Sequence, residues 1–367
     1  MSVLDRPSST PRESPPVDVD IDDAPRQLRR IEREHIAELL GSAFAALAVQ
    51  WLLLARLLPM EGAPAAVLIW YISFLVIYRF VAAQQHGKLA GKDRLATVVL
   101  WSFGLIVIGA LLLIIGYIVY RGAGNLRLNF FTDTLKTTGP LAPATEGGGL
   151  HSIVGTVMQV GIGLVIAVPL ALITAIYLSE VGGRLERPVR FVIDAMSGIP
   201  SIVAGLFVFV VWISAAKTGY SGFAAGLALS ILMLPTIART SMEMLRLVAD
   251  GYREAALALG APRWRVTWNI VIPTARSGLV TALILGVARA VGETAPVLLT
   301  AFGASVMNTN PFSGAQDDLP LFIYKQVRLF KDAPVDRAFT GAFVLLVFVL
   351  IAFVSARLIG GRARARR

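Results

Sequence analysis

The sequence predicts an all-α polytopic membrane protein, because it is strongly apolar and its apolar residues gather in long runs. Hydrophobic residues make up 56% of the 367 residues and charged residues only 16%, whereas soluble domains carry nearer a quarter charged residues. The mean hydropathy is +0.69. A helix needs roughly 20 apolar residues to cross a bilayer. Eight segments meet this length: 39–58, 64–83, 95–120, 152–178, 191–214, 221–242, 276–302 and 338–358.

The N-terminal part begins with a polar stretch. Residues 1–25 are rich in Pro, Ser, Asp and Arg and lack the apolar core of a signal peptide, so we expect a disordered cytoplasmic tail. Residues 26–90 are predicted to form a charged helix followed by a transmembrane hairpin with a tight turn at 59–62. The two hairpin helices are short and carry Arg56 and Arg79 near their ends. They either span the membrane or lie partly in its interface, and we favour spanning.

The six remaining spans fall within residues 91–360, and residues 361–367 form a basic tail. Lys and Arg close to membrane spans favour the cytoplasmic side. The N-terminal region, the segment 245–275 and the C-terminal tail are more basic than the loops that alternate with them. We therefore expect both termini and 245–275 in the cytoplasm. The expected external loops are 121–151, 215–220 and 303–337.

Several classes of chemistry are excluded by residue content. The chain contains no cysteine, and its three histidines stand far apart in the sequence, so no metal-ligand spacing is present. The glycine run at 147–149 lacks the following Lys and Ser or Thr of a phosphate-binding loop. A net charge of +10 suggests nucleic acid in a soluble protein, but in a membrane protein it reflects basic cytoplasmic loops. We expect neither enzyme activity nor a bound metal or cofactor in this chain.

Two ionisable residues lie inside the 276–302 span. Arg289 is near its middle, where an arginine is unfavourable by roughly 2.5–3.5 kcal/mol on insertion scales. Glu293 follows four residues later, on the same face of a continuous helix. Pro296 and its neighbours predict an interrupted helix, which a membrane tolerates where it faces protein or a watery cavity. A substrate path containing Arg289 and Glu293 is therefore favoured over a self-neutralising structural ion pair.

Further polar positions are candidates for the same path. Arg239 lies near the cytoplasmic end of its span and Asp194 one turn into another, so each either lines the path or reaches water. Ser201 ends a second interruption, at 197–201, which forms either a constriction or a packing kink. Thr294 falls within the break predicted before the proline of the 276–302 span.

A polar, basic island of about thirty residues separates the sixth and seventh spans. Alanines at 255, 256 and 258 favour a short helix. Gly260 is typical of a helix C-terminus, and Pro262 cannot continue that helix. A second, amphipathic run follows, with Arg263, Arg265, Trp264 and Trp268. Such an element at a membrane surface is suited to docking into a groove on a soluble partner.

The spacing within this island resembles the EAA loop of ABC importer permeases. That pattern is Glu-Ala-Ala, three residues, Gly, nine residues, Ile, one residue and Leu-Pro. The matching positions are Glu254, Ala255, Ala256, Gly260, Ile270 and Pro273. Ile272 replaces the usual Leu. The resemblance implies a six-helix type I permease core, preceded here by the N-terminal hairpin. It also implies that Glu254, Ala255, Ala256, Gly260 and Pro273 couple the chain to a cleft on an ATPase subunit.

Other stretches are similar to the phosphate-importing branch of this family. They are 148–156, 169–180, 197–205 and 288–296, and the resemblance covers roughly 95–360. It implies that Arg289 and Glu293 take part in phosphate passage, and it places a basic residue at Arg239. The partners implied are a second permease subunit, an ATPase dimer that uses ATP-Mg, and an extracytoplasmic phosphate-binding protein.

Alternative substrates and mechanisms remain open at this point. Arginine suits any oxyanion, so phosphate is favoured over sulfate, molybdate or phosphonate chiefly through the resemblance. One chemical argument adds to it, because Glu293 can accept the proton of monohydrogen phosphate and would repel sulfate, which has none. An ion-gradient-driven transporter working alone is disfavoured by the EAA-like loop, and a membrane enzyme by the lack of a catalytic cluster.

Overall fold

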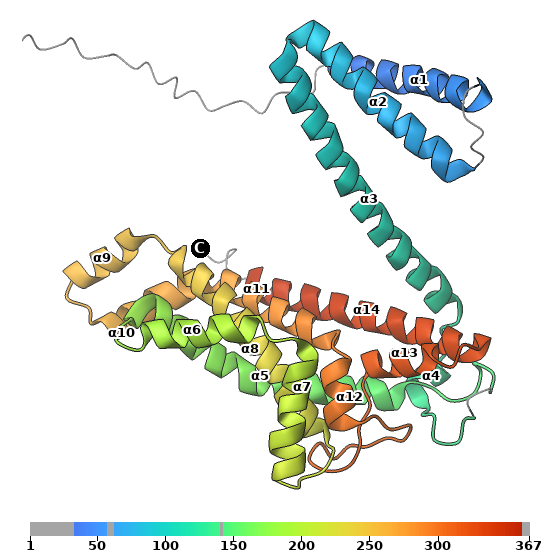
Figure 1. Cartoon of the computed structure of the whole chain (residues 1–367). Helices are drawn as coiled ribbons and strands as arrows, with labels where there is room; N and C mark the ends of the chain where they lie inside the picture. The colour runs from blue at the N-terminus through green and yellow to red at the C-terminus, as the bar shows by residue number, and fades with distance from the viewer. Residues whose placement is uncertain (1–32, 57–61, 140–141, 362–367) are drawn as a thin grey trace, which may run out of the picture. The chain divides into compact units, whose positions relative to one another are not determined.

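The computed structural model describes residues 33–56, 62–139 and 142–361. The tail predicted at 1–25 lies outside these ranges, as does all but the first residue of the basic tail. Backbone contacts divide the chain into two compact units, Met1–Gly109 and Ala110–Arg367. The boundary between them falls within helix α3 (Lys88–Gly124) (Figure 1).

The first unit contains the predicted helical hairpin. Its helices are α1 (Arg33–Arg56) and α2 (Ala63–His86), and they pack against each other. The Trp70 indole Nε1 on α2 donates a hydrogen bond of 3.1 Å to the Ala43 carbonyl on α1. Phe74 on α2 is buried in the small apolar cluster that joins the two helices. Both helices are long and apolar enough to cross a membrane.

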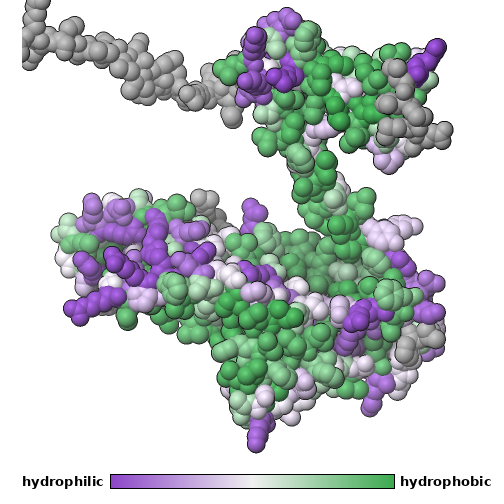
Figure 2. Space-filling model, in the orientation of Figure 1, coloured by the Kyte–Doolittle hydropathy of each residue, from purple (hydrophilic) through white to green (hydrophobic). Residues whose placement is uncertain are grey.

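The second unit is organised around α8 (Gly222–Arg246), which is buried over 67% of its most apolar stretch. This helix packs against α5 (Leu150–Ile176) and α11 (Ile272–Val291), and α11 packs against α14 (Asp332–Gly361) (Figure 1). Glycine allows the close approach, because a Cβ on Gly226 of α8 would lie 2.6 Å from Ile162 Cγ2 of α5. Figure 2 shows apolar side chains over the middle of this unit and hydrophilic ones gathered at its ends, as a membrane-spanning bundle requires.

The all-α prediction is confirmed across the described residues, where seven helices are long and apolar enough to span a membrane. An eighth is added if α6 (Glu186–Ser197) and α7 (Ser201–Val208) count as one span. This pair, continued by the π-helical segment η2 (Phe209–Ala215), occupies the span predicted at 191–214 and bends by 106°. Pro200 directly precedes α7, and the residue before a proline avoids the helical conformation. The interruption predicted at 197–201 is therefore confirmed.

The span predicted at 276–302 starts and ends earlier in the structure. The short helix α10 (Arg263–Val266) and the π-helical segment η3 (Thr267–Val271) lead directly into α11. A single apolar helical stretch of 29 residues results, from Arg263 to Val291. The second run of the polar island is therefore the first part of a span rather than a separate surface helix.

The segment predicted as an external loop at 303–337 also contains regular structure. Helix α13 (Leu319–Val327) lies within it, and α14 already begins at Asp332. The nine residues of α13 are too few to give a clear apolar period in the sequence.

Candidate functional site

The interruption predicted in the seventh span is present. Helix α11 ends at Val291, and the short helix α12 (Ala295–Ala301) begins after a gap of non-helical backbone. Pro296 lies in the first turn of α12, where its missing N–H has no helical partner to lose. Gly205 of α7 packs against it, since a Cβ there would lie 2.6 Å from Pro296 Cα. The contact between α7 and α12 thus brings two broken helices side by side (Figure 1).

Arg289 is exposed in this chain, in the last turn of α11. Its Nη1 donates a hydrogen bond of 3.3 Å to the Thr236 hydroxyl on α8. The two ionisable residues of this span form no ion pair with each other within the described ranges. Glu293 lies beyond the end of α11, so it does not share a helical face with Arg289, and that expectation was wrong. The break at Gly292 therefore separates the two charges.

Arg239 lies three residues after Thr236, on the same side of α8. Its Nη2 is 2.5 Å from Asp194 Oδ1 of α6. The Arg239 side chain is 44% exposed, and Arg289 is exposed as well. The guanidinium groups of Arg239 and Arg289 therefore both lie on one side of α8, the first as part of that helix and the second through its hydrogen bond to Thr236. Thr236 is a site residue that the sequence did not indicate, although it lies three residues before Arg239 and therefore on the same face of a helix.

The two remaining path candidates lie at the starts of helices that follow a break. Ser201 is the first residue of α7 and Thr294 directly precedes α12. Both side chains are half-buried. Because α7 and α12 contact each other, these hydroxyl residues belong to the same interrupted region of the bundle.

The coupling candidates lie on α9 (Asp250–Ala258) and the turn after it. Gly260 has a φ of +82°, a conformation that side chains with a Cβ rarely adopt, so the predicted helix stop is confirmed. Glu254 and Ala255 are exposed, whereas Ala256 is buried against Val266 and its neighbours. Pro273, also exposed, lies in the first turn of α11.

A buried ion pair fixes α9 to the rest of the bundle. The Arg253 Nη2 is 2.8 Å from Oε1 of Glu180 in the π-helical turn η1 (Tyr177–Val181), and it donates to the Leu245 carbonyl at 2.9 Å. The Glu180 side chain is only 7% exposed. The hydrogen bond that Arg253 donates to the Glu180 carboxylate raises the pKa of Arg253 above its ordinary value. In the sequence Arg253 stood out only as a marker of the cytoplasmic side.

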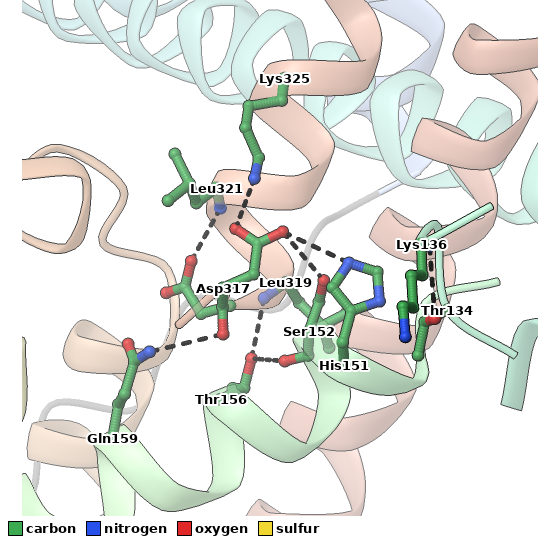
Figure 3. A network of polar contacts seen from close by, with 11 residues as sticks. Thr134, Lys136, His151, Ser152, Thr156, Gln159, Asp317, Leu319, Leu321 and Lys325 are labelled. Carbon is green, nitrogen blue, oxygen red and sulfur yellow. Dashed lines mark hydrogen bonds and ion pairs between the residues drawn. The ribbon is translucent and has the colours of Figure 1, made fainter. Parts of the chain in front are cut away.

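At the other end of the second unit, a polar network surrounds Asp317 (Figure 3). Its Oδ1 is 2.9 Å from Lys325 Nζ, and its Oδ2 accepts a hydrogen bond of 3.1 Å from the Ser152 hydroxyl and lies 3.6 Å from His151 Nε2. The carboxylate is only 1% exposed and lies at the N-terminal end of α5, where the helix dipole favours an anion. This network, which the sequence did not indicate, fastens the 303–318 segment to α5.

Comparison with known proteins identifies the family. Residues 167–365 match the family model described as "binding-protein-dependent transport system inner membrane component". The chain belongs to this family. It is therefore the multi-pass membrane component, or permease, of a binding-protein-dependent transport system.

Curated relatives of this permease are similar over most of their length. PstA 1 of Mycobacterium tuberculosis, a phosphate transport system permease protein, is 39% identical over 278 residues, which are 75% of this chain and 91% of the relative. PstA of Pasteurella multocida is 35% identical over 244 residues, which are 66% and 84% of the two chains.

A solved structure shows the same fold. It is a bacterial alginate ABC transporter in complex with a periplasmic protein bound to an alginate pentasaccharide. The matched chain has a TM-score of 0.51 and 16% identity, covering 73% of this permease and 97% of that chain. The expected ABC importer permease fold is thus confirmed.

The neighbouring aspartates of the permease, Asp317 and Asp318, are expected to respond in opposite ways to amide substitution. Asp317→Asn leaves the Lys325 ammonium without its carboxylate, so we expect the free energy of unfolding to fall by about 1–3 kcal/mol. Asp318 caps α13 by accepting the Leu321 N–H at 2.9 Å, and Asn retains that acceptor. Burial, followed by the nearby Asp317 charge, raises the pKa of Asp318 well above its ordinary value.

Thermal unfolding in detergent at several pH values tests this pair of variants. A raised folded-state pKa means that the stability contributed by Asp318 is present at low pH and is lost as the pH rises through that pKa. Asn carries no titrating proton, so Asp318→Asn should be at least as stable as the native permease at neutral pH, with the difference shrinking in acid. Equal destabilisation by both variants would contradict the distinction.

Proposed function

We propose that this permease moves inorganic phosphate into the cytoplasm as one subunit of an ATP-driven importer. The observation that carries the proposal is the 39% identity to a phosphate transport system permease over 91% of that relative. The positions of Arg239 on α8 and of Arg289 on α11, bonded to Thr236 of α8, support it, because planar guanidinium groups pair well with oxyanions.

In this proposal phosphate passes the region where the broken helices meet. Arg289 and Arg239 attract the anion, and the half-buried hydroxyls of Ser201 and Thr294 supply neutral hydrogen bonds. The Glu293 carboxylate accepts a hydrogen bond from the hydroxyl group of monohydrogen phosphate. Because Arg289 forms no ion pair with Glu293 in the described part of the chain, both groups are available to the ion. Each interaction must be weak and transient, since a passage also has to release its ion.

The partners proposed are those of an ABC importer. A second permease subunit completes the passage, an extracytoplasmic phosphate-binding protein delivers the ion, and an ATPase dimer binds ATP-Mg, so no cofactor is held by this chain. Closure of the ATPase dimer is transmitted to the helices by the coupling residues. These are Glu254, Ala255, Ala256 and Gly260, with Pro273 at the start of α11. The exposed Leu257, Leu259 and Trp264 give the element apolar surface suited to docking.

The location proposed is the bacterial plasma membrane, with both termini and α9 in the cytoplasm. The distribution of Lys and Arg supports this orientation. In the same orientation the Asp317 network lies at the extracytoplasmic end of the bundle.

Loss of the ion pair between η1 and α9 should uncouple ATP hydrolysis from transport. Glu180→Gln leaves Arg253, whose side chain is only 18% exposed, without a carboxylate partner from η1, so α9 is held less firmly. We expect phosphate uptake to fall about 3- to 10-fold, a loss of roughly 1 kcal/mol in coupling, while ATP hydrolysis persists. The measurement is phosphate transported per ATP hydrolysed. Glu243→Gln, an exposed position on α8, is the matched control and should leave this ratio unchanged.

Reconstitution in vesicles with the candidate partners tests the function itself. We expect ATP-dependent uptake of phosphate and little uptake of sulfate. Glu293→Gln replaces a charged acceptor for the phosphate hydroxyl by a weaker neutral one. It also cannot repel sulfate by charge, so it should narrow the preference for phosphate over sulfate about 10-fold, equivalent to about 1.4 kcal/mol. Uptake of sulfate as fast as phosphate by the native transporter would point to another oxyanion. Uptake without any ATPase would point to an ion-gradient-driven transporter.

A further inference from the structure

A polar cavity of about 410 Å³ lies between the coupling loop, residues 246–273, and the helical core. Its walls come from separate elements: Arg246 at the end of α8, Ser179 and Glu180 of η1, Arg253 of α9, and Arg263 of α10. A water molecule takes up about 30 Å³ in the liquid, so the cavity is large enough for a small hydrated ion or a lipid headgroup. It is distinct from the phosphate path proposed around Arg289.

The charges around this cavity are unevenly compensated. Two carboxylates line it, and Arg253 binds both of them, Glu180 at 2.8 Å and Asp250 at 3.1 Å. The other two lining arginines, Arg246 and Arg263, are exposed and form no ion pair in the part of the chain that the structure describes. Three arginines thus face two carboxylates, so the cavity carries a net positive charge, and Arg246 and Arg263 have no ion-pair partner of their own among the described residues.

A hydroxyl group adds to this donor set. Ser179 lines the cavity, and its Oγ is buried with no hydrogen-bond partner among the described residues. The guanidinium groups of Arg246 on α8 and Arg263 on α10, with the Ser179 hydroxyl, supply several hydrogen-bond donors. Such donors suit a ligand that carries several anionic oxygens. A carboxylate has only two oxygens and could accept from fewer of these donors than a phosphate group.

We propose that this cavity binds a phosphate group through Arg246 and Arg263, and that the bound group ties the start of α10 to the end of α8. The source is inorganic phosphate or the headgroup of an anionic lipid on the α9 side of the membrane. The proposal rests on the proposed function only for the assignment of that side to the cytoplasm. Because α9, the turn at Gly260 and α10 are consecutive, a group bound here restrains the coupling loop.

Binding to the full-length permease in phosphatidylcholine nanodiscs tests the first source. Radiolabelled inorganic phosphate is the probe, and an Arg289→Ala background removes binding in the proposed path. We expect saturable binding that falls at least about 10-fold when Arg246→Gln and Arg263→Gln are combined. Arg265→Gln is the matched control, because Arg265 also lies on α10 but stacks 5.3 Å from the Trp264 ring and does not line the cavity. It should leave binding unchanged.

Native mass spectrometry in discs that contain phosphatidylglycerol tests the second source. Retention of this lipid by the native chain and its loss in the double variant would identify a headgroup. With either ligand, amide exchange over 250–267 should slow only when both arginines are present.

The outcomes distinguish the phosphate-group site from the proposed transport function. If neither ligand binds in an arginine-dependent manner, the phosphate-group site is refuted. The site is also refuted if neither ligand binds and the only effect of the double variant is that the permease no longer assembles with the ATPase subunit. The arginines would then serve a protein contact. Arginine-dependent binding in a chain that supports no phosphate uptake would instead refute the proposed function and leave this site intact.

Discussion

Arg289→Ala is expected to lower ATP-driven phosphate uptake about 10- to 100-fold. A charge-assisted hydrogen bond is worth about 1.5–3 kcal/mol, and each 1.4 kcal/mol corresponds to a factor of ten. Arg289 is exposed at the end of α11 and is bonded in the described chain only to the Thr236 hydroxyl. Its guanidinium is therefore free to bind an anion, and its loss should affect transport far more than stability. Initial uptake rates in vesicles provide the measurement.

Two further variants separate this role from a general effect of positive charge. Arg289→Lys retains the charge but loses the planar pair of donors, so uptake should recover only in part. Arg276→Ala removes an exposed arginine from the same helix, α11, and should leave uptake near the native rate. Native uptake by Arg289→Ala in a correctly assembled transporter would remove Arg289 from the path.

Gly260→Leu is expected to abolish most ATP-driven uptake while leaving membrane insertion intact. The glycine has a φ of +82°, and a side chain forced into such a conformation costs about 1–3 kcal/mol. No neighbouring atom would lie within 4 Å of an added Cβ, so the expected effect is one of backbone conformation rather than of a clash at the Cβ. Relief of the strain would redirect the turn and move α9 away from the ATPase cleft. The measurements are uptake, ATP hydrolysis and the amount of inserted protein.

The chain offers a close control for this substitution. Gly251 lies on α9, also has open space where a Cβ would be, and has no positive φ. Gly251→Leu should therefore preserve the turn and most of the uptake. Gly260→Asn should retain more activity than Gly260→Leu, because Asn tolerates the left-handed region. Equal uptake in the two leucine variants would argue against a requirement for this turn geometry.

Features that depend on local chemistry could be predicted from the sequence. The spans follow from apolar runs of sufficient length, and the helix breaks follow from proline and glycine, which act on their own backbone. Gly260 and the break before Pro296 were located on this basis. The spacing of the EAA-like loop indicated the family, which the comparison with known proteins confirmed. The roles of the path and coupling residues remain predictions.

Contacts between distant segments could not be predicted in this way. Arg253 and Glu180 are 73 positions apart, and Ser152 and Asp317 are 165 apart. Such pairs depend on how helices cross and pack, which the periodicity of one helix does not report. For the same reason the sequence suggested Glu293 as the neighbour of Arg289, whereas the structure provides Thr236. The apolar pattern determined which segments cross the membrane, and helix packing determined which polar groups meet between them.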